Sequence, residues 1–327
     1  MKELALASFA AASDAHLVGE PRSARFAAFK AAFDARAELE RLRALGFRFL
    51  GRSDPGFPPL LRAIHDPPPG LFLRGDADAG LLALPAVAIV GARACSAYGR
   101  QIARSIAREL ASAGLVIVSG LARGVDAEAH RGALEAGGVT VAVLGCGIDR
   151  DYPAANRELA RQVAASGLIV SEYAPGVEPA PWRFPARNRI VAGLCSASVV
   201  VEARERSGAL ITADFALEEG REVLAVPGEI TSALSAGSNA LLRLGATPLT
   251  CAQDVLESFG LVAADRAEPE VGPTASSVLA RVREAAAGAD ELARATGLSA
   301  EELAIALTEL ELTGAVLEEG GVYRPAR

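Results

Sequence analysis

Arginine side chains follow glycines at two points where the sequence predicts that a buried strand ends. Residues 87–90 form an apolar run, a glycine follows directly, and Arg93 lies two residues after that glycine. A second apolar run, residues 115–118, leads into Ser-Gly-Leu-Ala-Arg-Gly, in which Arg123 precedes the second glycine. Glycine turns expose backbone N–H groups, and guanidinium groups and helix N-termini also favour anions. The pattern therefore predicts an anion site, with a structural salt bridge as the alternative role of Arg93.

The same stretch predicts a parallel sheet. Both apolar runs are continuous, as expected of strands that are buried on both faces, and residues 97–113 between them have helical periodicity. Strand, helix and strand form a βαβ unit, and parallel strands all end at one edge of their sheet. We therefore expect the two glycine turns to lie side by side.

Strands and helices continue to alternate along the chain. Further strands are predicted at residues 140–144, 168–171, 198–201 and 223–226, and further helices at residues 126–135, 154–165, 187–194, 211–219 and 238–244. Alternation of this kind is typical of an α/β fold with a doubly wound parallel sheet.

Composition and the positions of stretches rich in glycine and proline predict four parts in the chain. They are a small helical domain of the SAM or helix-hairpin-helix kind at residues 1–53, the sheet domain at 54–262, an acidic linker at 263–273, and a winged-helix-like domain at 274–327. The sheet domain begins with a stretch rich in proline and glycine, residues 54–75, which predicts an ordered, irregular connection. Three helices and a hairpin around Gly320 predict the winged helix.

The third helix of the last domain, residues 299–313, carries acidic side chains and neither lysine nor arginine. In winged-helix readers of duplex DNA this helix enters the major groove, where glutamates would repel phosphates. We therefore predict that the domain contacts protein, or the rest of its own chain, and does not bind duplex DNA.

Charge is unevenly distributed. The net charge is −7, but residues 262–327 carry −6 of it and the first 261 residues only −1. Two islands, residues 91–108 and 179–201, contain arginines and no acid. An acidic average therefore does not exclude a nucleic-acid partner. Residues 81–92, the longest apolar run, are too short to cross a membrane, so no membrane contact is expected. Four scattered cysteines predict no zinc site and a reducing, cytoplasmic location.

Aromatic and basic side chains alternate in Trp-Arg-Phe-Pro-Ala-Arg-Asn-Arg, residues 182–189. Phe184 can stack on a base while the arginines meet phosphates, which is how single strands are held without reading sequence. Alternatively, the aromatic side chains cap the core and the arginines pair with Glu172 or Glu202. The lack of an acid within the island favours binding.

No catalytic, metal or cofactor site is predicted. The chain has neither a dinucleotide fingerprint nor a P-loop, and Gly145-Cys146-Gly147 indicates only a tight turn. Asp126 and His130 form a possible acid/base pair, but a helix N-cap for the first and packing for the second are favoured. Glu172 is expected to have a structural role.

The ordered landmarks of the chain closely resemble those of the DNA-processing protein A family (DprA, also called Smf). They are His65-Asp66-Pro67-Pro68, LFLRG at 71–75, VGAR at 90–93, SGLARGVD at 119–126 with His130, Tyr152-Pro153 with Asn156, Ser171-Glu172, FPARNRI at 184–190, SGALITA at 207–213, Pro227-Gly228 and GSN at 237–239.

The resemblance implies an extended Rossmann-like core that binds single-stranded DNA, protects it, forms a homodimer and loads the RecA recombinase in natural transformation, without being an enzyme. The expected DNA contacts are Arg93, Gly120, Arg123, Gly124, Arg150, Tyr152, Asn156, Phe184, Arg187, Asn188 and Arg189. Ala154 and Pro181 stand where relatives often have basic residues, and Arg150 and Arg183 can supply the missing charge.

Two other classes of function stay open on the sequence. One is a nucleotide hydrolase of the phosphoribohydrolase type, similar to the so-called lysine decarboxylase family, whose signature is Pro-Gly-Gly-x-Gly-Thr-x-x-Glu. This chain has only Pro227-Gly228-Glu229 and then Gly237-Ser238-Asn239. The other is a pure protein-interaction scaffold, which would have neither DNA affinity nor turnover.

Overall fold

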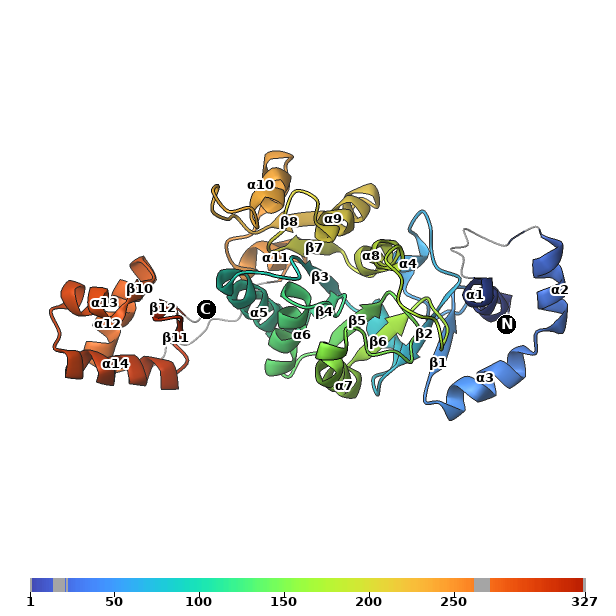
Figure 1. The fold of residues 1–327 in the computed structure, drawn as a ribbon, viewed down its shortest axis with the longest axis horizontal. Helices are drawn as coiled ribbons and strands as arrows, with labels where there is room; N and C mark the ends of the chain where they lie inside the picture. Colours follow the sequence, from blue (N-terminus) through green and yellow to red (C-terminus); the bar gives the residue numbers. More distant parts are fainter. Residues whose placement is uncertain (1, 14–20, 22, 262–270, 326–327) are drawn as a thin grey trace. The chain divides into compact units, whose positions relative to one another are not determined.

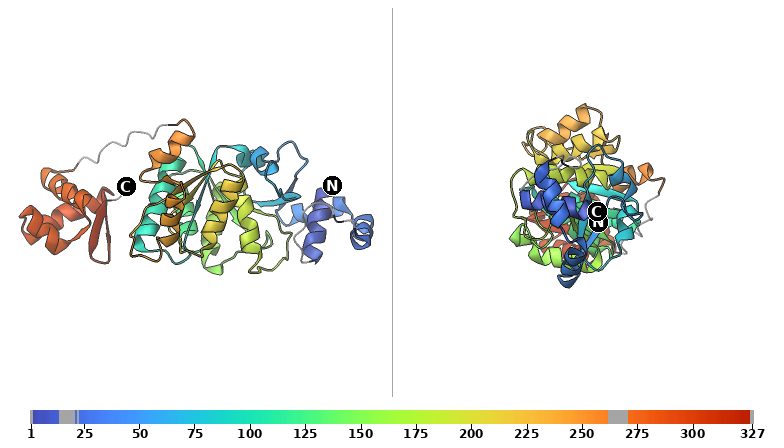
Figure 2. Two further views of the ribbon diagram at one scale, coloured as in Figure 1. Left: turned by 90° about the horizontal axis from the view of Figure 1, so that it is seen from above. Right: turned by 90° about the vertical axis from the view of Figure 1, so that its right-hand side faces the viewer.

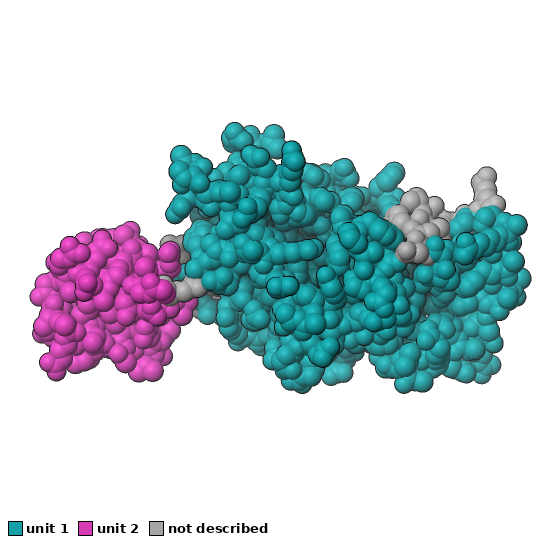
Figure 3. All heavy atoms as spheres, in the orientation of Figure 1, with its two compact units in different colours: residues 1–263 teal, residues 264–327 magenta. Residues whose placement is uncertain are grey.

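The computed structural model describes residues 2–13, 21, 23–261 and 271–325. The chain divides into two compact units, residues 1–263 and residues 264–327 (Figure 3). No helix among the described residues is long and apolar enough to span a membrane.

A nine-stranded sheet forms the centre of the first unit, in the order β1-β2-β6-β5-β4-β3-β7-β8-β9 (Figure 1). The strands are β1 (Arg48–Gly51), β2 (Gly70–Arg74), β3 (Ala86–Val90), β4 (Val116–Ser119), β5 (Thr140–Leu144), β6 (Leu168–Ser171), β7 (Ala197–Val200), β8 (Glu222–Ala225) and β9 (Thr247–Pro248). From β6 to β9 all neighbours are parallel. The chain leaves β3 first toward β4 and later returns to its other side as β7, so the predicted doubly wound sheet is confirmed.

Helices cover both faces of the sheet (Figure 1, Figure 2). One face packs against α5 (Ala97–Ser112), α6 (Val125–Glu135), α7 (Arg157–Ser166) and α11 (Ala252–Ser258). The other packs against α4 (Pro59–Arg62), α8 (Arg183–Gly193), α9 (Gly208–Glu218) and α10 (Ala236–Arg243).

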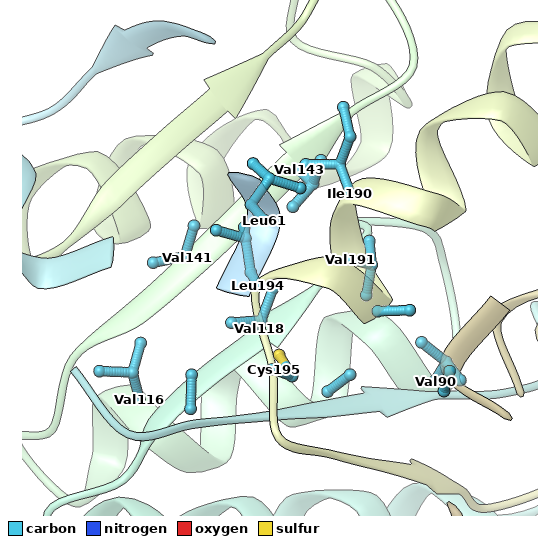
Figure 4. Close-up of a cluster of buried hydrophobic side chains, with 14 of the residues drawn as sticks. Leu61, Val90, Val116, Val118, Val141, Val143, Ile190, Val191, Leu194 and Cys195 are labelled. Carbon is cyan, nitrogen blue, oxygen red and sulfur yellow. The ribbon is translucent and has the colours of Figure 1, made fainter. Parts of the chain in front are cut away.

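The apolar runs fill both layers because successive side chains of a strand point to opposite faces. Val116 and Val118 of β4 belong to the core beside Ile190 of α8, whereas Ile117 belongs to the core beside Leu110 of α5. Figure 4 shows the first of these cores, in which side chains of neighbouring strands meet α8. The continuous apolar pattern therefore correctly predicted strands buried on both faces.

The stretch between residues 48 and 75 contains sheet structure that we did not predict. Strands β1 and β2 pair antiparallel, and β2 continues antiparallel along β6, with Leu73 opposite Val170. The predicted boundary at residue 53 therefore falls between two paired strands. The prolines at 67–69 lie in the connection between the strands. Because proline is unfavourable inside a strand, they made the whole stretch look irregular in the sequence.

The N-terminal helices pack on the same unit. They are α1 (Lys2–Ser13), α2 (Ala24–Ala32) and α3 (Ala35–Ala44). Leu4 of α1 and Leu42 of α3 share a buried cluster with Phe72 of β2 and Leu144 of β5. These helices therefore share part of the core of the sheet, while Leu6, Phe9 and Phe26 form a small buried cluster of their own.

The C-terminal unit has the predicted winged-helix-like fold. Helices α12 (Pro273–Glu284), α13 (Ala289–Thr296) and α14 (Ala300–Leu312) pack with a sheet of order β10-β12-β11, whose strands are β10 (Ala287–Gly288), β11 (Val316–Glu319) and β12 (Val322–Pro325). Val278, Leu292, Leu307 and Val316 are buried at its centre. The predicted linker, residues 263–273, lies outside the described residues except for its last three.

Acidic side chains lie on the outside of α14. Glu301, Glu302 and Glu311 are exposed, while Glu309 accepts a hydrogen bond from the backbone N–H of Gly272 at 2.6 Å. The helix that would enter a major groove therefore presents negative charge to solvent.

We expect a fragment of residues 264–327 to bind no duplex DNA at physiological salt, because its exposed glutamates repel phosphates. Fluorescence anisotropy with a labelled duplex measures this. The variant Glu301→Lys with Glu311→Lys serves as a control, because it keeps the fold and should gain salt-sensitive binding. A parent fragment that binds duplex as tightly as the intact chain would contradict the prediction.

Candidate nucleic-acid interface

Two adjoining pockets lie at the carboxyl ends of the central strands. Their volumes are about 470 and 320 Å³. The residues that line both are Arg93, Gly120, Ala122, Tyr152, Phe184 and Arg187. They follow β3, β4 and β5 or begin α8, so the two glycine turns lie side by side as predicted. Ligands of doubly wound sheets bind at this edge, where the strand order reverses.

Two arginines bring positive charge to these pockets, and the carboxyl group of Asp126 also lines the larger one. Arg93 lines both pockets and Arg123 lines the smaller one, and both side chains are exposed. Neither has an ion-pair partner within the described ranges of the chain. The alternative role of Arg93, a structural salt bridge, is therefore not what the structure shows. Both guanidinium groups remain available to an anion.

Phe184 lines both pockets. Its ring stacks on Tyr152, with 5.3 Å between the centroids and an interplanar angle of 26°. The guanidinium carbon of Arg93 lies 5.4 Å from the centroid of the Phe184 ring. Tyr152 keeps 41% of its surface exposed. Aromatic faces and cations of this kind suit an unstacked base and its phosphate.

Arg187 supplies a fixed charge at the back of the pockets. The side chain is only 5% exposed, and its Nη1 donates to the carbonyl oxygens of Gly120, at 2.8 Å, and Val143. Its Nε donates to Oδ1 of Asn188 at 3.1 Å. Burial lowers the pKa of Arg187, and the nearby Asp126 carboxylate opposes that shift. Asn188 itself lines the larger pocket and donates through Nδ2 to the carbonyl of Gly208 at 3.0 Å.

Arg189 is a correction to the predicted contact set. Its Nη2 donates to Oε1 of Glu172 at 2.6 Å and its Nε to Oδ2 of Asp66 at 3.0 Å. The side chain is 5% exposed and lines neither pocket. The alternative interpretation, pairing with Glu172, is therefore right for this arginine. The structural role expected of Glu172 is confirmed.

The two arginines expected to supply missing charge do not reach the pockets. Arg150 lies 2.6 Å from the Glu178 carboxylate, and Arg183 is buried, donates to the carbonyl of Glu178 and lies over the Trp182 ring. Neither lines either pocket. The positions of Ala154 and Pro181 are therefore not compensated by these two side chains.

Two predicted contacts act within the protein instead. Asn156 is 5% exposed and its Nδ2 donates to the carbonyl oxygens of Leu121, at 2.9 Å, and Ala122, at 3.2 Å. Gly124 has φ +76°, and a Cβ there would lie 2.3 Å from the carbonyl oxygen of Ala92. Neither residue lines a pocket, so both shape the loop rather than face a ligand.

The prediction that Asp126 is the N-cap of its helix is wrong. Helix α6 begins at Val125, and the Asp126 carboxylate accepts hydrogen bonds from the N–H groups of Gly120 at 3.1 Å and Ala122 at 3.4 Å. Burial raises the pKa of this carboxyl group, although Arg187 and the two N–H groups act in the opposite direction. Asp126 therefore holds the loop that precedes its own helix.

A helix N-terminus at the pocket was missed. Ser207 caps α9, accepting from the N–H of Ala209 at 3.3 Å, and the first residues of α9 line the larger pocket. The sequence predicts this helix only from residue 211, whereas α9 begins at Gly208. The N-terminus of α5 is instead taken by Glu202, whose carboxylate accepts from the N–H of Ser96 at 2.8 Å. The partial positive charge near the pocket therefore comes from α9.

His130 packs as predicted and forms no acid/base pair with Asp126. Its ring is fully buried, and Nδ1 lies 2.7 Å from Oγ1 of Thr140. Burial lowers the pKa of His130 to about 3. Among the described residues, no group of three or more His, Cys, Asp or Glu side chains could hold a metal ion.

The pKa of His130 predicts acid sensitivity. In the unfolded chain the imidazole takes up a proton near pH 6.5, whereas in the folded protein it stays neutral down to about pH 3. The unfolded state therefore binds more protons between these values, and stability falls as pH decreases through this window. We expect the free energy of unfolding, measured with urea at several pH values, to depend less on pH in His130→Gln than in the parent. Equal slopes would contradict this.

Comparison with known proteins places the chain among DNA-processing proteins. Residues 48–260 match the family model of DNA recombination-mediator protein A, and residues 262–321 match the DprA winged helix domain. The DNA processing protein DprA of Streptococcus pneumoniae is 48% identical over 206 residues, which is 63% of this chain and 72% of the relative.

Two solved structures are similar. The X-ray structure of DprA from Streptococcus pneumoniae has a TM-score of 0.67 and 41% identity, and the match covers 78% of this chain and 91% of the other. A structure of DprA from Helicobacter pylori, whose subject is its single-stranded DNA binding mode, has a TM-score of 0.59 and 33% identity. That match covers 65% of this chain and 95% of the other.

Proposed function

The chain belongs to the DNA recombination-mediator protein A family, and we propose that it binds single-stranded DNA in the two pockets beside Phe184. The observation that carries the proposal is the placement of Arg93 and Arg123, exposed and without an ion-pair partner in the described part of the chain, next to the stacked rings of Phe184 and Tyr152. The binding described for the relative from Helicobacter pylori supports it.

The arrangement favours a single strand over a duplex for a steric reason. A base reaches an aromatic ring in a pocket only when it is unstacked and unpaired, as in single strands. Arg187 and the N-terminus of α9 line the larger pocket from behind and add positive charge. Phosphates at the rim would meet Arg93 and Arg123.

We further propose that the bound strand is protected and passed to the RecA recombinase during natural transformation, in the cytoplasm. The matching family is described as a recombination mediator, which supports a step between DNA entry and strand exchange. The four cysteines are free, which suits a reducing compartment.

The protein is proposed to bind DNA without converting it. A base poised near neutral pH is the usual proton acceptor in hydrolysis. His130 is buried against Thr140 with a pKa of about 3, and the carboxylate of Asp126 is engaged by two loop N–H groups. Both candidates therefore have structural roles.

We expect Arg93→Ala to weaken binding of a labelled oligonucleotide and to lower the slope of log K against log salt by about 0.7, since one phosphate contact is lost. Phe184→Ala should weaken binding by about 1–3 kcal/mol per base, with the slope retained. Anisotropy across a salt series measures both quantities.

Arg161→Ala is the matched control, because it removes an arginine that is paired with Glu158 on the exposed side of α7 and lines neither pocket. Its affinity should equal that of the parent. Parent affinity in both Arg93→Ala and Phe184→Ala would rule out this site.

We also propose a homodimer. Ile230 and Leu244, which flank α10, are 95% and 84% exposed and are candidates for burial between copies. Light scattering at several concentrations, with and without oligonucleotide, should show twice the chain mass for the parent. Ile230→Asp with Leu244→Asp should reduce it if α10 is the contact; a parent that stays at one chain mass throughout would refute the dimer.

A further inference from the structure

We propose that Asn156 is a positioning residue for single-stranded DNA binding, because it fixes the loop at residues 120–124 to the turn that carries Tyr152. The inference rests on the function proposed for the same pockets. It concerns how the walls of the pockets are held in place, and it gives Asn156 a role other than contact with DNA.

Asn156 has no donor left for a phosphate. Both of its amide hydrogens are directed at main-chain oxygens, those of Leu121 and Ala122, at N–O distances of 2.9 and 3.2 Å. The residue is 5% exposed and lines neither pocket. Any effect of Asn156 on DNA must therefore pass through the loop that it holds.

The loop needs to be held, because its conformation is unfavourable by itself. Leu121 has φ +57°, the only positive φ at a non-glycine residue in the described part of the chain, and its side chain is fully buried. A leucine adopts this left-handed region only when surrounding contacts over-determine it.

Three side chains from separate elements supply those contacts. Asp126 of α6 accepts from the N–H groups of Gly120 and Ala122, and Arg187 of α8 donates to the carbonyl of Gly120. Asn156 donates to the carbonyl oxygens of Leu121 and Ala122. It is the member of the three that belongs to the turn after Tyr152.

Each of the two segments that Asn156 joins carries a residue of the smaller pocket. Arg123 comes directly after the clamped residues, and Tyr152 lies four residues before Asn156. Both line the smaller pocket, and Tyr152 supports the Phe184 ring. Loss of the two Asn156 hydrogen bonds would free both Arg123 and Tyr152 to move, while the charges of the site would be unchanged.

The test uses Asn156→Leu in the full chain, a change of similar volume that removes both donors without adding charge. Loss of pre-organisation should weaken binding of a labelled oligonucleotide by about tenfold. The salt slope should stay at the parent value, because no phosphate contact is removed. Arg123→Ala should instead lower that slope by about 0.7.

Thr140→Val is the matched control for a lost buried hydrogen bond. Thr140 begins β5, at the end of the strand away from the pockets, and its hydroxyl donates to the carbonyl of Ile117 at 2.7 Å and lies 2.7 Å from Nδ1 of His130. This variant should melt at a lower temperature than the parent and bind the oligonucleotide with parent affinity.

Amide hydrogen exchange, measured without DNA, reports how firmly the loop at residues 120–124 is held. In Asn156→Leu, residues 120–122 should exchange faster than in the parent, while β5 should not; Asn156→Ser serves if the leucine variant does not fold. Unchanged exchange, parent affinity, or a slope that falls as in Arg123→Ala would each overturn the positioning role. Failure of the parent itself to bind single strands would instead overturn the proposed function, and the exchange result would still decide whether Asn156 holds the loop.

Discussion

Arg187 places a guanidinium group inside the edge of the sheet, where an uncompensated charge would cost several kcal/mol. Two carbonyl oxygens, of Gly120 after β4 and of Val143 in β5, accept hydrogen bonds from it. Because these bonds run from α8 to neighbouring strands, they fix the distance between the helix that carries Phe184 and the loop that carries Arg123. The positions of the pocket walls therefore depend on a charge that is itself mostly hidden from solvent.

Five arginines, on α8 and at the two glycine turns, fall into two groups by environment. Arg183, Arg187 and Arg189 are buried and donate hydrogen bonds to carbonyl or carboxylate oxygens, so they hold α8 in place. Arg93 and Arg123 are exposed and line the pockets. The buried group gives rigidity, and in the proposed function the exposed group supplies the field that attracts phosphates. A chain with a net charge of −7 can therefore present a basic site, because screening confines surface electrostatics to about 10 Å.

The sequence predicted the sheet and the location of the site better than the role of each side chain. Apolar runs that end at glycines indicate strands and a common edge, and both conclusions depend only on local pattern. The partners of Arg189 could not be found in the same way, because Asp66 lies 123 residues away along the chain. Asp126 illustrates the same limit, since its position before a helix suggested a cap, while its carboxylate turns back to Gly120. Strands β1 and β2 were missed because prolines interrupt the stretch that joins them.

The loop at residues 120–124 shows why a motif can be essential without every residue touching a ligand. Its two glycines serve packing: a Cβ at Gly120 would lie 2.3 Å from the Arg187 guanidinium, and one at Gly124 would meet the carbonyl of Ala92. Asp126 and Asn156 then satisfy the backbone groups that the tight turn leaves open. Within the loop at residues 120–124, Arg123 alone carries a charged side chain, which lines the smaller pocket, and the other loop residues determine where its guanidinium group lies. If the proposed site binds DNA, replacing a motif residue weakens binding through the geometry of Arg123, so affinity alone does not separate contact from position.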